Sequence, residues 1–273
     1  MKRALLAVPF YAAVVVALAF LTLPVVALFT RVTPAKLVGQ LGNQVVTDAL
    51  VVSLETTLIA QVLILAFGTP LAYLLASRRF PGRPLLVTLV ELPLVLPPAV
   101  AGLGLLAAFG RLGLLGSTLD ALGVSIPFTQ TAVILAVAFV ASPLYVRTAI
   151  AAFQSVDPDV AAASRTLGAG PTRTFFRVIL PLAAGGLAAG EALAFARGLG
   201  EFGATIMFAG SLQGVTQTLP LAIYAAFDVN LDVALAMGAL LVVVSAVLLL
   251  SLRLILSWQP SRQTSRSLFA PLS

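Results

Sequence analysis

The sequence contains no cysteine and no histidine. Disulfides, thiolate nucleophiles, imidazole bases and nearly all zinc sites are therefore excluded. Lysine occurs only at Lys2 and Lys36, and no GxxxxGK[ST] loop is present to cradle nucleotide phosphates. The chain alone therefore cannot hydrolyse ATP. Serines follow glycine at Ser117 and Ser211, but without a histidine or a buried lysine neither can become a nucleophile.

Charge is also scarce. Charged residues make up 10% of the 273 residues, against about 25% in soluble domains, whereas 60% are hydrophobic and the mean hydropathy is +1.09. This composition predicts an integral membrane protein. The net charge of +6 comes from basic residues dispersed between apolar runs, so nucleic acid is not an expected partner.

Long apolar runs divide the chain into membrane spans, each needing about 20 residues. The first run is too long for the apolar core of a signal peptide, about 7 to 15 residues, and we expect it to be retained. Leu219–Phe227 is too short to cross alone, and we expect it to be partly buried or re-entrant. The sequence therefore predicts an all-α polytopic fold with six spans, at 5–30, 50–77, 84–109, 130–153, 182–208 and 231–257.

Basic residues predict the orientation, because they accumulate in cytoplasmic loops. Arg31, Lys36 and Arg111 fall outside in this scheme, and Arg197 falls within the fifth span. The other 12 of the 16 fall inside: Lys2, Arg3, Arg78, Arg79, Arg83, Arg147, Arg165, Arg173, Arg177, Arg253, Arg262 and Arg266. We therefore expect a multi-pass protein of the cell membrane with both termini in the cytoplasm.

The chain divides by these features into three parts. Residues 1–46 hold the first span and an extracytoplasmic loop, 47–258 the transmembrane core, and 259–273 a cytoplasmic tail with a polar stretch at 259–267. Trp258, at the end of the last span, suits the aromatic belt of a membrane interface.

The longest cytoplasmic loop, 154–181, carries helix signals. Asp157-Pro158-Asp159 combines an N-cap, a proline at the first helical position and an acid in the first turn, so a helix should begin at Pro158. Its apolar positions Val160, Ala163 and Leu167 share one face.

Gly168 should close this helix in the left-handed conformation. Gly170-Pro171 then begins a second helical stretch, which bears Phe175 and Phe176 and, at i and i+4, Arg173 and Arg177. We therefore expect two short helices that meet at a glycine turn, before Leu180-Pro181 leads into the fifth span.

Within this loop, AASRTLGAGPTRTFFRVILP at 162–181 resembles the EAA loop of ABC importer permeases. Gly168 matches the family's glycine, and Val178, Leu180 and Pro181 meet the spacing of its Ile-x-Leu-Pro end. Ala162 stands where the family usually has glutamate, and Ser164 replaces the second alanine.

The resemblance implies that the loop is a coupling helix seated in a groove of a cytoplasmic ATPase. A helix resting on lipid headgroups is the alternative, but alanine and glycine bury little apolar area there. We expect the contact to depend on small residues and basic neighbours rather than on an acidic anchor. The residues implied are Val160, Ala162, Ala163, Ser164, Arg165, Leu167, Gly168, Ala169 and Arg173.

A second cluster lies at the end of the fifth span, where Glu191, Arg197 and Glu201 carry charge in an apolar run. Charge at that depth is costly, so these side chains should face protein or water. Arg197 and Glu201 are spaced i and i+4 and can pair on one helical face. The nearby glycines permit a broken helix, which suits a gate.

The strings ARGLGEFGATIMFAG and TQTLPLAIY, at 196–210 and 216–224, are very similar to permease subunits of molybdate and tungstate importers. Sulfate permeases share the GEFGA part. ELPLVLPPAVAG at 91–102 also matches, and the resemblance covers nearly the whole chain from about Thr47. A translocation path or gate is implied at Glu91, Pro97, Arg197, Glu201, Phe202, Gly203, Thr216 and Gln217.

Prolines 93, 97 and 98 should bend or unwind the third span, either as a purely structural kink or beside substrate. Glu55 and Glu91 are expected to be buried acids that are hydrogen-bonded or neutral.

The resemblance implies these partners: two copies of an ABC ATPase, a second copy of this chain, an extracytoplasmic oxyanion-binding protein and the lipid bilayer. ATP and Mg would be bound by the ATPase, with no cofactor or metal on this chain. A sulfate or thiosulfate permease is the nearest alternative. An ion-coupled secondary transporter is disfavoured because the two halves show no clear repeat.

Overall fold

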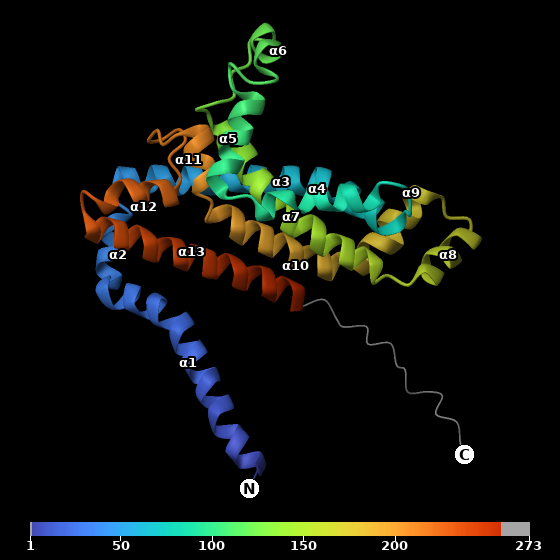
Figure 1. Ribbon diagram of the computed structural model, residues 1–273, viewed down its shortest axis with the longest axis horizontal. Helices are drawn as coiled ribbons and strands as arrows, with labels where there is room; N and C mark the ends of the chain where they lie inside the picture. The colour runs from blue at the N-terminus through green and yellow to red at the C-terminus, as the bar shows by residue number, and fades with distance from the viewer. Residues whose placement is uncertain (1, 258–273) are drawn as a thin grey trace.

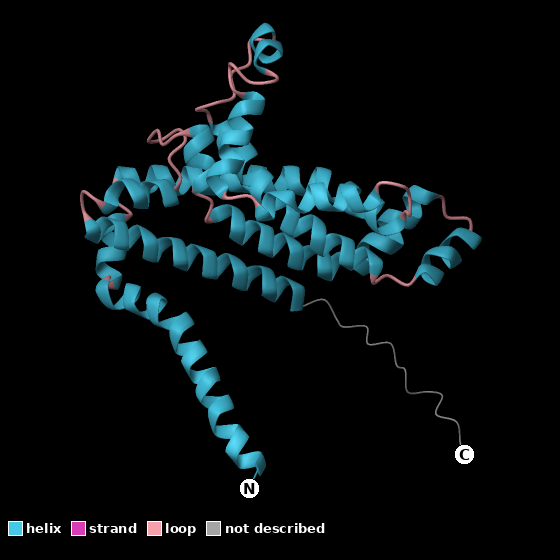
Figure 2. Ribbon diagram, in the orientation of Figure 1, coloured by secondary structure: helices cyan, strands magenta, loops and turns pink. Residues whose placement is uncertain are grey.

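The computed structural model describes residues 2–257, which form helices and connecting loops without a strand (Figure 2). In chain order the elements are α1 (Lys2–Arg31), α2 (Pro34–Gln40), α3 (Gln44–Ser77), α4 (Arg83–Val95), α5 (Pro98–Phe109), α6 (Gly116–Ala121), α7 (Gln130–Gln154), α8 (Pro158–Thr166), α9 (Pro171–Thr174), the π-helical turn η1 (Phe175–Ile179), α10 (Leu180–Leu199), α11 (Gly203–Ala209), α12 (Leu219–Phe227) and α13 (Leu231–Ser257). The all-α, multi-pass prediction is confirmed.

Helix starts follow local capping chemistry. The side chain of Asn43 accepts the Val45 N–H at 3.0 Å before α3, and that of Thr129 accepts the Ala132 N–H at 3.4 Å before α7. Proline occupies the first turn of α4, α5, α8, α9 and α12, where its missing N–H leaves no helix bond unmade.

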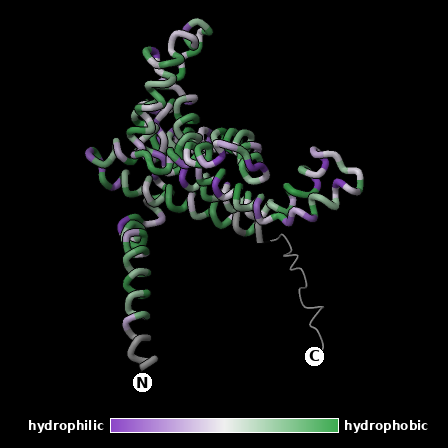
Figure 3. Tube along the Cα trace, turned by 45° about the vertical axis from the view of Figure 1, so that its right-hand side comes forward, coloured by the Kyte–Doolittle hydropathy of each residue, from purple (hydrophilic) through white to green (hydrophobic). Residues whose placement is uncertain are grey.

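The centre of the molecule is a bundle in which α3 and α10 both pack against α7 (Figure 1). The contact between α7 and α10 buries alanines from both helices, among them Ala149, Ala152, Ala183 and Ala194. Small side chains let helix backbones approach closely within a membrane. The apolar colouring of Figure 3 runs along these helices, and α8 and α9 lie at one end of the bundle.

In the described part of the chain, five helices are long and apolar enough to cross a membrane: Pro9–Arg31, Gln44–Ser77, Gln130–Gln154, Pro171–Leu199 and Leu231–Ser251. They correspond to five of the six predicted spans. The protein is therefore a multi-pass membrane protein.

The predicted span at 84–109 is divided into two helices. α4 and α5 meet at a bend of 116° and count as a sixth span only if taken together. The cause is Pro97-Pro98: Leu96 and Pro97 take extended conformations, with ψ of 133° and 134°, and neither proline has an N–H to donate. The expectation of a bent span is confirmed, although the bend is far sharper than a kink.

The predicted fifth span, 182–208, is wrong at both ends. Its helix begins at Pro171, because α9 and α10 are joined through the π-helical turn, and it ends at Leu199. The helix breaks at residues 200–202, which begin with Gly200, and 203–209 form the separate helix α11.

α12 is a nine-residue helix that packs against α3 and α13 and buries Leu219, Leu221 and Ala222. It confirms the expected short, partly buried segment. By contrast, α1 diverges from the bundle, and its most apolar window has no buried residue (Figure 1). Trp258, the stretch at 259–267, Arg262 and Arg266 lie outside the described residues.

Candidate functional site

The helix expected in the cytoplasmic loop is present as α8. The side chain of Asp157 caps it by accepting the Asp159 N–H at 2.9 Å, and Pro158 is its first residue. Gly168 follows the end of the helix with φ of +84°, in the left-handed region that favours glycine. The predicted start, end and glycine turn are confirmed.

α8 is attached to the rest of the chain along one side only. Ala161 is 8% exposed and belongs to the core cluster that links α3, α7 and α10, and Ser164 Oγ lies 3.1 Å from Thr174 Oγ1 of α9. The opposite side is open, since Leu167 is 88% and Val160 43% exposed. Ala162 and Ala163 are exposed beside them. The predicted apolar face is therefore presented outward, at the end of the bundle.

Both predicted basic neighbours are exposed. Arg165 Nε donates to the Ala161 carbonyl of its own helix at 3.2 Å, and Arg173 lies in α9. Ala169 is half-buried in the turn between the helices. The predicted coupling residues thus lie together at one corner of the molecule.

Glu201 joins the two helices that meet at the second candidate site. Its side chain is 1% exposed and lies 2.6 Å from the Arg197 guanidinium at the end of α10. Its Oε1 accepts the Ala204 N–H of α11 at 2.8 Å. The predicted pairing of Arg197 with Glu201 is confirmed, and the carboxylate also caps α11.

Two other predicted residues lie in the same neighbourhood. A Cβ on Gly203 would lie 2.6 Å from Pro98 Cβ, so the proline-rich start of α5, next to Pro97, packs directly on the break. The ring of Phe202 lies 5.2 Å from that of Tyr224 in α12. The break therefore contacts both α5 and α12.

Thr216 and Gln217 lie in the adjoining loop and are buried. Thr216 Oγ1 accepts the Leu212 N–H at 2.9 Å, and Gln217 Nε2 donates to Ser211 Oγ at 3.2 Å. These contacts close the loop on itself before α12 begins.

A buried polar row on α3 escaped the sequence reasoning. Ser53, Thr57 and Gln61 are at most 4% exposed, and Ser53 Oγ accepts the Leu219 N–H of α12 at 2.7 Å. A Cβ on Gly198 would lie 3.3 Å from Gln61 Nε2, so this amide faces the end of α10. Neither side-chain polar atom of Gln61 has a hydrogen-bond partner among residues 2–257. The available sequence signal was the i, i+4, i+8 spacing of Ser53, Thr57 and Gln61 within an apolar span.

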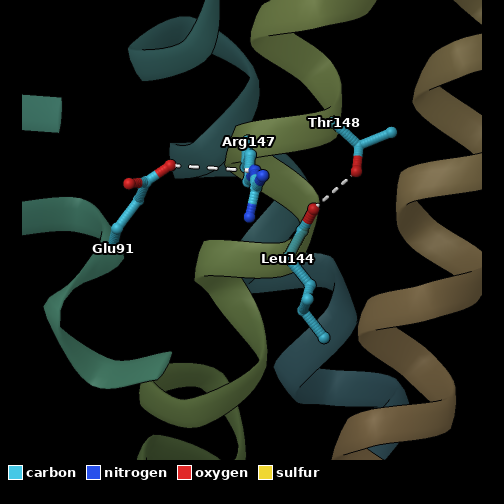
Figure 4. A network of polar contacts seen from close by, with 4 residues as sticks. All are labelled: Glu91, Leu144, Arg147 and Thr148. Atoms are coloured by element: carbon cyan, nitrogen blue, oxygen red, sulfur yellow. Dashed lines mark hydrogen bonds and ion pairs between the residues drawn. The ribbon is translucent and has the colours of Figure 1, made fainter. Parts of the chain in front are cut away.

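Glu91 does not join this site. It lies on α4, with its Oε1 3.9 Å from Nε of Arg147 on α7 (Figure 4), and its side chain is 41% exposed. Glu55 is exposed on α3 because the helix turns Ser53, Thr56 and Thr57 inward instead. The expectation that Glu55 and Glu91 are buried is therefore wrong. An apolar run in the sequence does not determine which side of the helix a residue lies on, or whether another helix covers that side.

Comparison with known proteins places these features in a family. Residues 68–263 match the family model described as "Binding-protein-dependent transport system inner membrane component". The chain is 44% identical over 242 residues to the "Molybdenum transport system permease protein ModB" of Mycobacterium tuberculosis, covering 88% of this chain and 91% of that protein. It is 41% identical to a "Probable molybdenum ABC transporter permease protein" of Haloferax volcanii, covering 86% and 85%.

Solved structures show the same fold. A bacterial ABC transporter that imports alginate contains a chain with TM-score 0.72 and 17% identity, covering 94% of this chain and 96% of that one. A chain of the MetNI methionine ABC transporter has a TM-score of 0.61 and 20% sequence identity, covering 78% of this chain and 95% of that one. The chain has the type I ABC importer permease fold and belongs to the family of inner membrane components of binding-protein-dependent transport systems.

Proposed function

We propose that this chain is the membrane-spanning subunit of an ATP-driven importer and that it moves molybdate or tungstate into the cell. The observation that carries the proposal is the exposed apolar face of α8, at one end of a multi-pass bundle, in a sequence with no nucleotide-binding loop. The substrate follows from the molybdenum permeases, which match most of this chain at 41–44% identity.

The partner at α8 is an ABC ATPase. An apolar helix face that residues 2–257 leave uncovered suits a groove on another protein, where Leu167 supplies the largest side chain. Because the end of the bundle that bears α8 is cytoplasmic in this scheme, both termini are cytoplasmic as well. ATP and Mg are bound by the ATPase and not by this chain.

Two copies of the chain assemble with two copies of the ATPase. Each chain has one docking helix, so two nucleotide sites require two chains related by symmetry. Glu55, exposed on the membrane-spanning helix α3, also favours a second copy, since an acid facing lipid costs about 2.5–3.5 kcal/mol.

The translocation path passes the break between α10 and α11. The arguments are the pair of the buried Glu201 with the half-buried Arg197, the polar row of α3 and the non-helical backbone at 200–202. Irregular backbone at membrane depth is tolerated where protein or water covers it. An extracytoplasmic binding protein selects the oxyanion and delivers it to the end of the bundle opposite α8.

Reconstituted vesicles test this function. The chain, its ATPase and its binding protein are expected to show ATP hydrolysis that rises on adding molybdate or tungstate. Stimulation by sulfate or thiosulfate alone would assign the chain to sulfate-type permeases instead. No stimulation by any of these oxyanions would contradict the proposal.

A further inference from the structure

A hollow of about 810 Å³ opens between the cytoplasmic end of α3 and the loop that carries α8 and α9. Its floor is apolar and aromatic, with Pro70 and Tyr73 from α3 and Phe175 and Ile179 from the turn that begins the fifth span. The rings of Tyr73 and Phe175 lie 4.7 Å apart. The hollow thus lies between two membrane-spanning helices.

The rim of the hollow is basic and hydroxyl-rich. Arg78, the residue after α3, and Arg165 of α8 both line it, together with the hydroxyl side chains of Ser77 and Thr172. Among residues 2–257 no aspartate or glutamate lines this hollow. The rim therefore suits an anion.

The depth of the hollow matches a lipid headgroup. α3 has 34 residues and is therefore about 51 Å long, which exceeds the roughly 30 Å hydrocarbon core and reaches both headgroup regions. Pro70 lies two helical turns before Ser77, so the apolar floor continues about 10 Å toward the hydrocarbon. A phosphate at the rim can thus be joined to an acyl chain along the floor.

The hollow lies on the side of α8 that turns away from the docking face. At 100° per residue, Arg165 is about 40° from the buried Ala161 and about 160° from the exposed Leu167. A partner that covers Leu167 therefore does not need to fill the hollow.

We propose that this hollow binds an anionic phospholipid of the cytoplasmic leaflet, with its phosphate between Arg78 and Arg165 and an acyl chain over Pro70, Phe176 and Ile179. Basic pockets between membrane helices on the cytoplasmic side are suited to anionic headgroups. The lipid ties the end of α3 to the coupling loop. The site is separate from the proposed translocation path, and it requires no particular substrate.

The test uses the permease–ATPase complex in nanodiscs of phosphatidylcholine with a minor share of a photoactivatable phosphatidylglycerol. We expect crosslinks on residues 70–78 and 171–179, mapped by mass spectrometry. Arg78→Gln should weaken phosphatidylglycerol capture there roughly 10-fold, because a charge-assisted hydrogen bond is lost. Arg79→Gln, the same change at an exposed neighbour outside the hollow, should leave capture unchanged.

Three results would overturn the proposal. Equal capture by the parent, Arg78→Gln and Arg79→Gln would show that the hollow does not select the lipid. Displacement of the lipid by excess inorganic phosphate, with no acyl-chain crosslink to residues 70–78, would assign a free oxyanion instead. Loss of the ATPase from Arg78→Gln at unchanged lipid capture would assign the rim to the protein partner.

Discussion

The carboxylate of Glu201 holds the break between α10 and α11 from both sides, through Arg197 and the Ala204 N–H. Glu201→Gln keeps an acceptor for Ala204 but leaves the Arg197 guanidinium, 33% exposed, without its anion. Since the loss of one partner from a largely buried pair is costly, we expect a loss of about 1–3 kcal/mol of stability and slower ATP-driven uptake. The measurements are the unfolding temperature and vesicle uptake.

Asp120→Asn is the matched control for Glu201→Gln. It neutralises the partner of Arg111 in an ion pair of 3.5 Å whose side chains are 85% and 54% exposed. An exposed pair of this kind contributes about 0–1 kcal/mol, so this variant should behave like the parent. Equal effects of the two substitutions would contradict the role given to Glu201.

Substitutions at Gly168 and Gly170 test the effect of backbone conformation separately from that of side-chain crowding. A Cβ at either position meets no atom within 4 Å, but only Gly168 has a positive φ, +84°. Gly168→Ala should cost about 1–2 kcal/mol in the glycine turn and lower transport per ATP hydrolysed, whereas Gly170→Ala should not. Unchanged coupling in Gly168→Ala, measured as molybdate taken up per phosphate released, would count against the turn as the coupling element.

Single residues were predictable where the signal was local. The i, i+4 spacing predicted the Arg197–Glu201 pair, and the position of Gly168 predicted its conformation. Glu55 was misjudged, and Gln61 was missed, because the face that a helix turns inward depends on its neighbours. In a run apolar on all sides, periodicity does not identify that face.

α8 is the element on which the ATPase contact depends, and Leu167, the residue that caps its C-terminal end, is 88% exposed. Leu167→Glu should place a charge in the docking groove and weaken ATPase binding roughly 10-fold or more, as measured by co-purification and titration. Leu212→Glu introduces the same charge at a leucine that is 50% exposed in the loop near α12 and should not affect binding. Full ATPase binding by Leu167→Glu would exclude α8 as the contact.

α5 and α11 approach closely at Gly102, where a Cβ would lie 2.6 Å from the Ala204 carbonyl oxygen. Gly102→Ala should therefore push α5 from α11 and destabilise the protein by about 1–3 kcal/mol, seen as a lower unfolding temperature. Two residues on, a Cβ at Gly104 would meet nothing within 4 Å, so Gly104→Ala should be neutral. Identical unfolding temperatures for the two variants would contradict this packing.

Helices whose ends carry strong capping signals were predictable from the sequence. The directions in which successive helices run were not. Asp157, Pro158 and Gly168 predicted both ends of α8. The hydropathy pattern predicted one span where the structure has α4 and α5, because the average hydropathy of an apolar run does not change at a turn such as the 116° bend at Pro97-Pro98. Beyond this turn α5 packs against α11, a contact between segments far apart in the sequence that no local pattern contains.

At the scale of the whole molecule, the docking helix α8 adjoins, across the glycine turn, the long helix that leads to the break. The span Pro171–Leu199 begins beside α8 and ends at residue 199, just before the break, so a displacement at the ATPase can reach the path through a single helix. The order of the spans was predictable from hydropathy, but this connection was not, since the π-helical turn has no clear sequence signal.

Uptake by sealed vesicles that contain the chain and its ATPase tests this arrangement most directly. With ATP and Mg on the side of α8, and the binding protein and molybdate on the other, entrapped molybdenum should accumulate only when all four are present. Accumulation driven by an ion gradient without ATP or the ATPase would make the chain a secondary transporter and contradict the account.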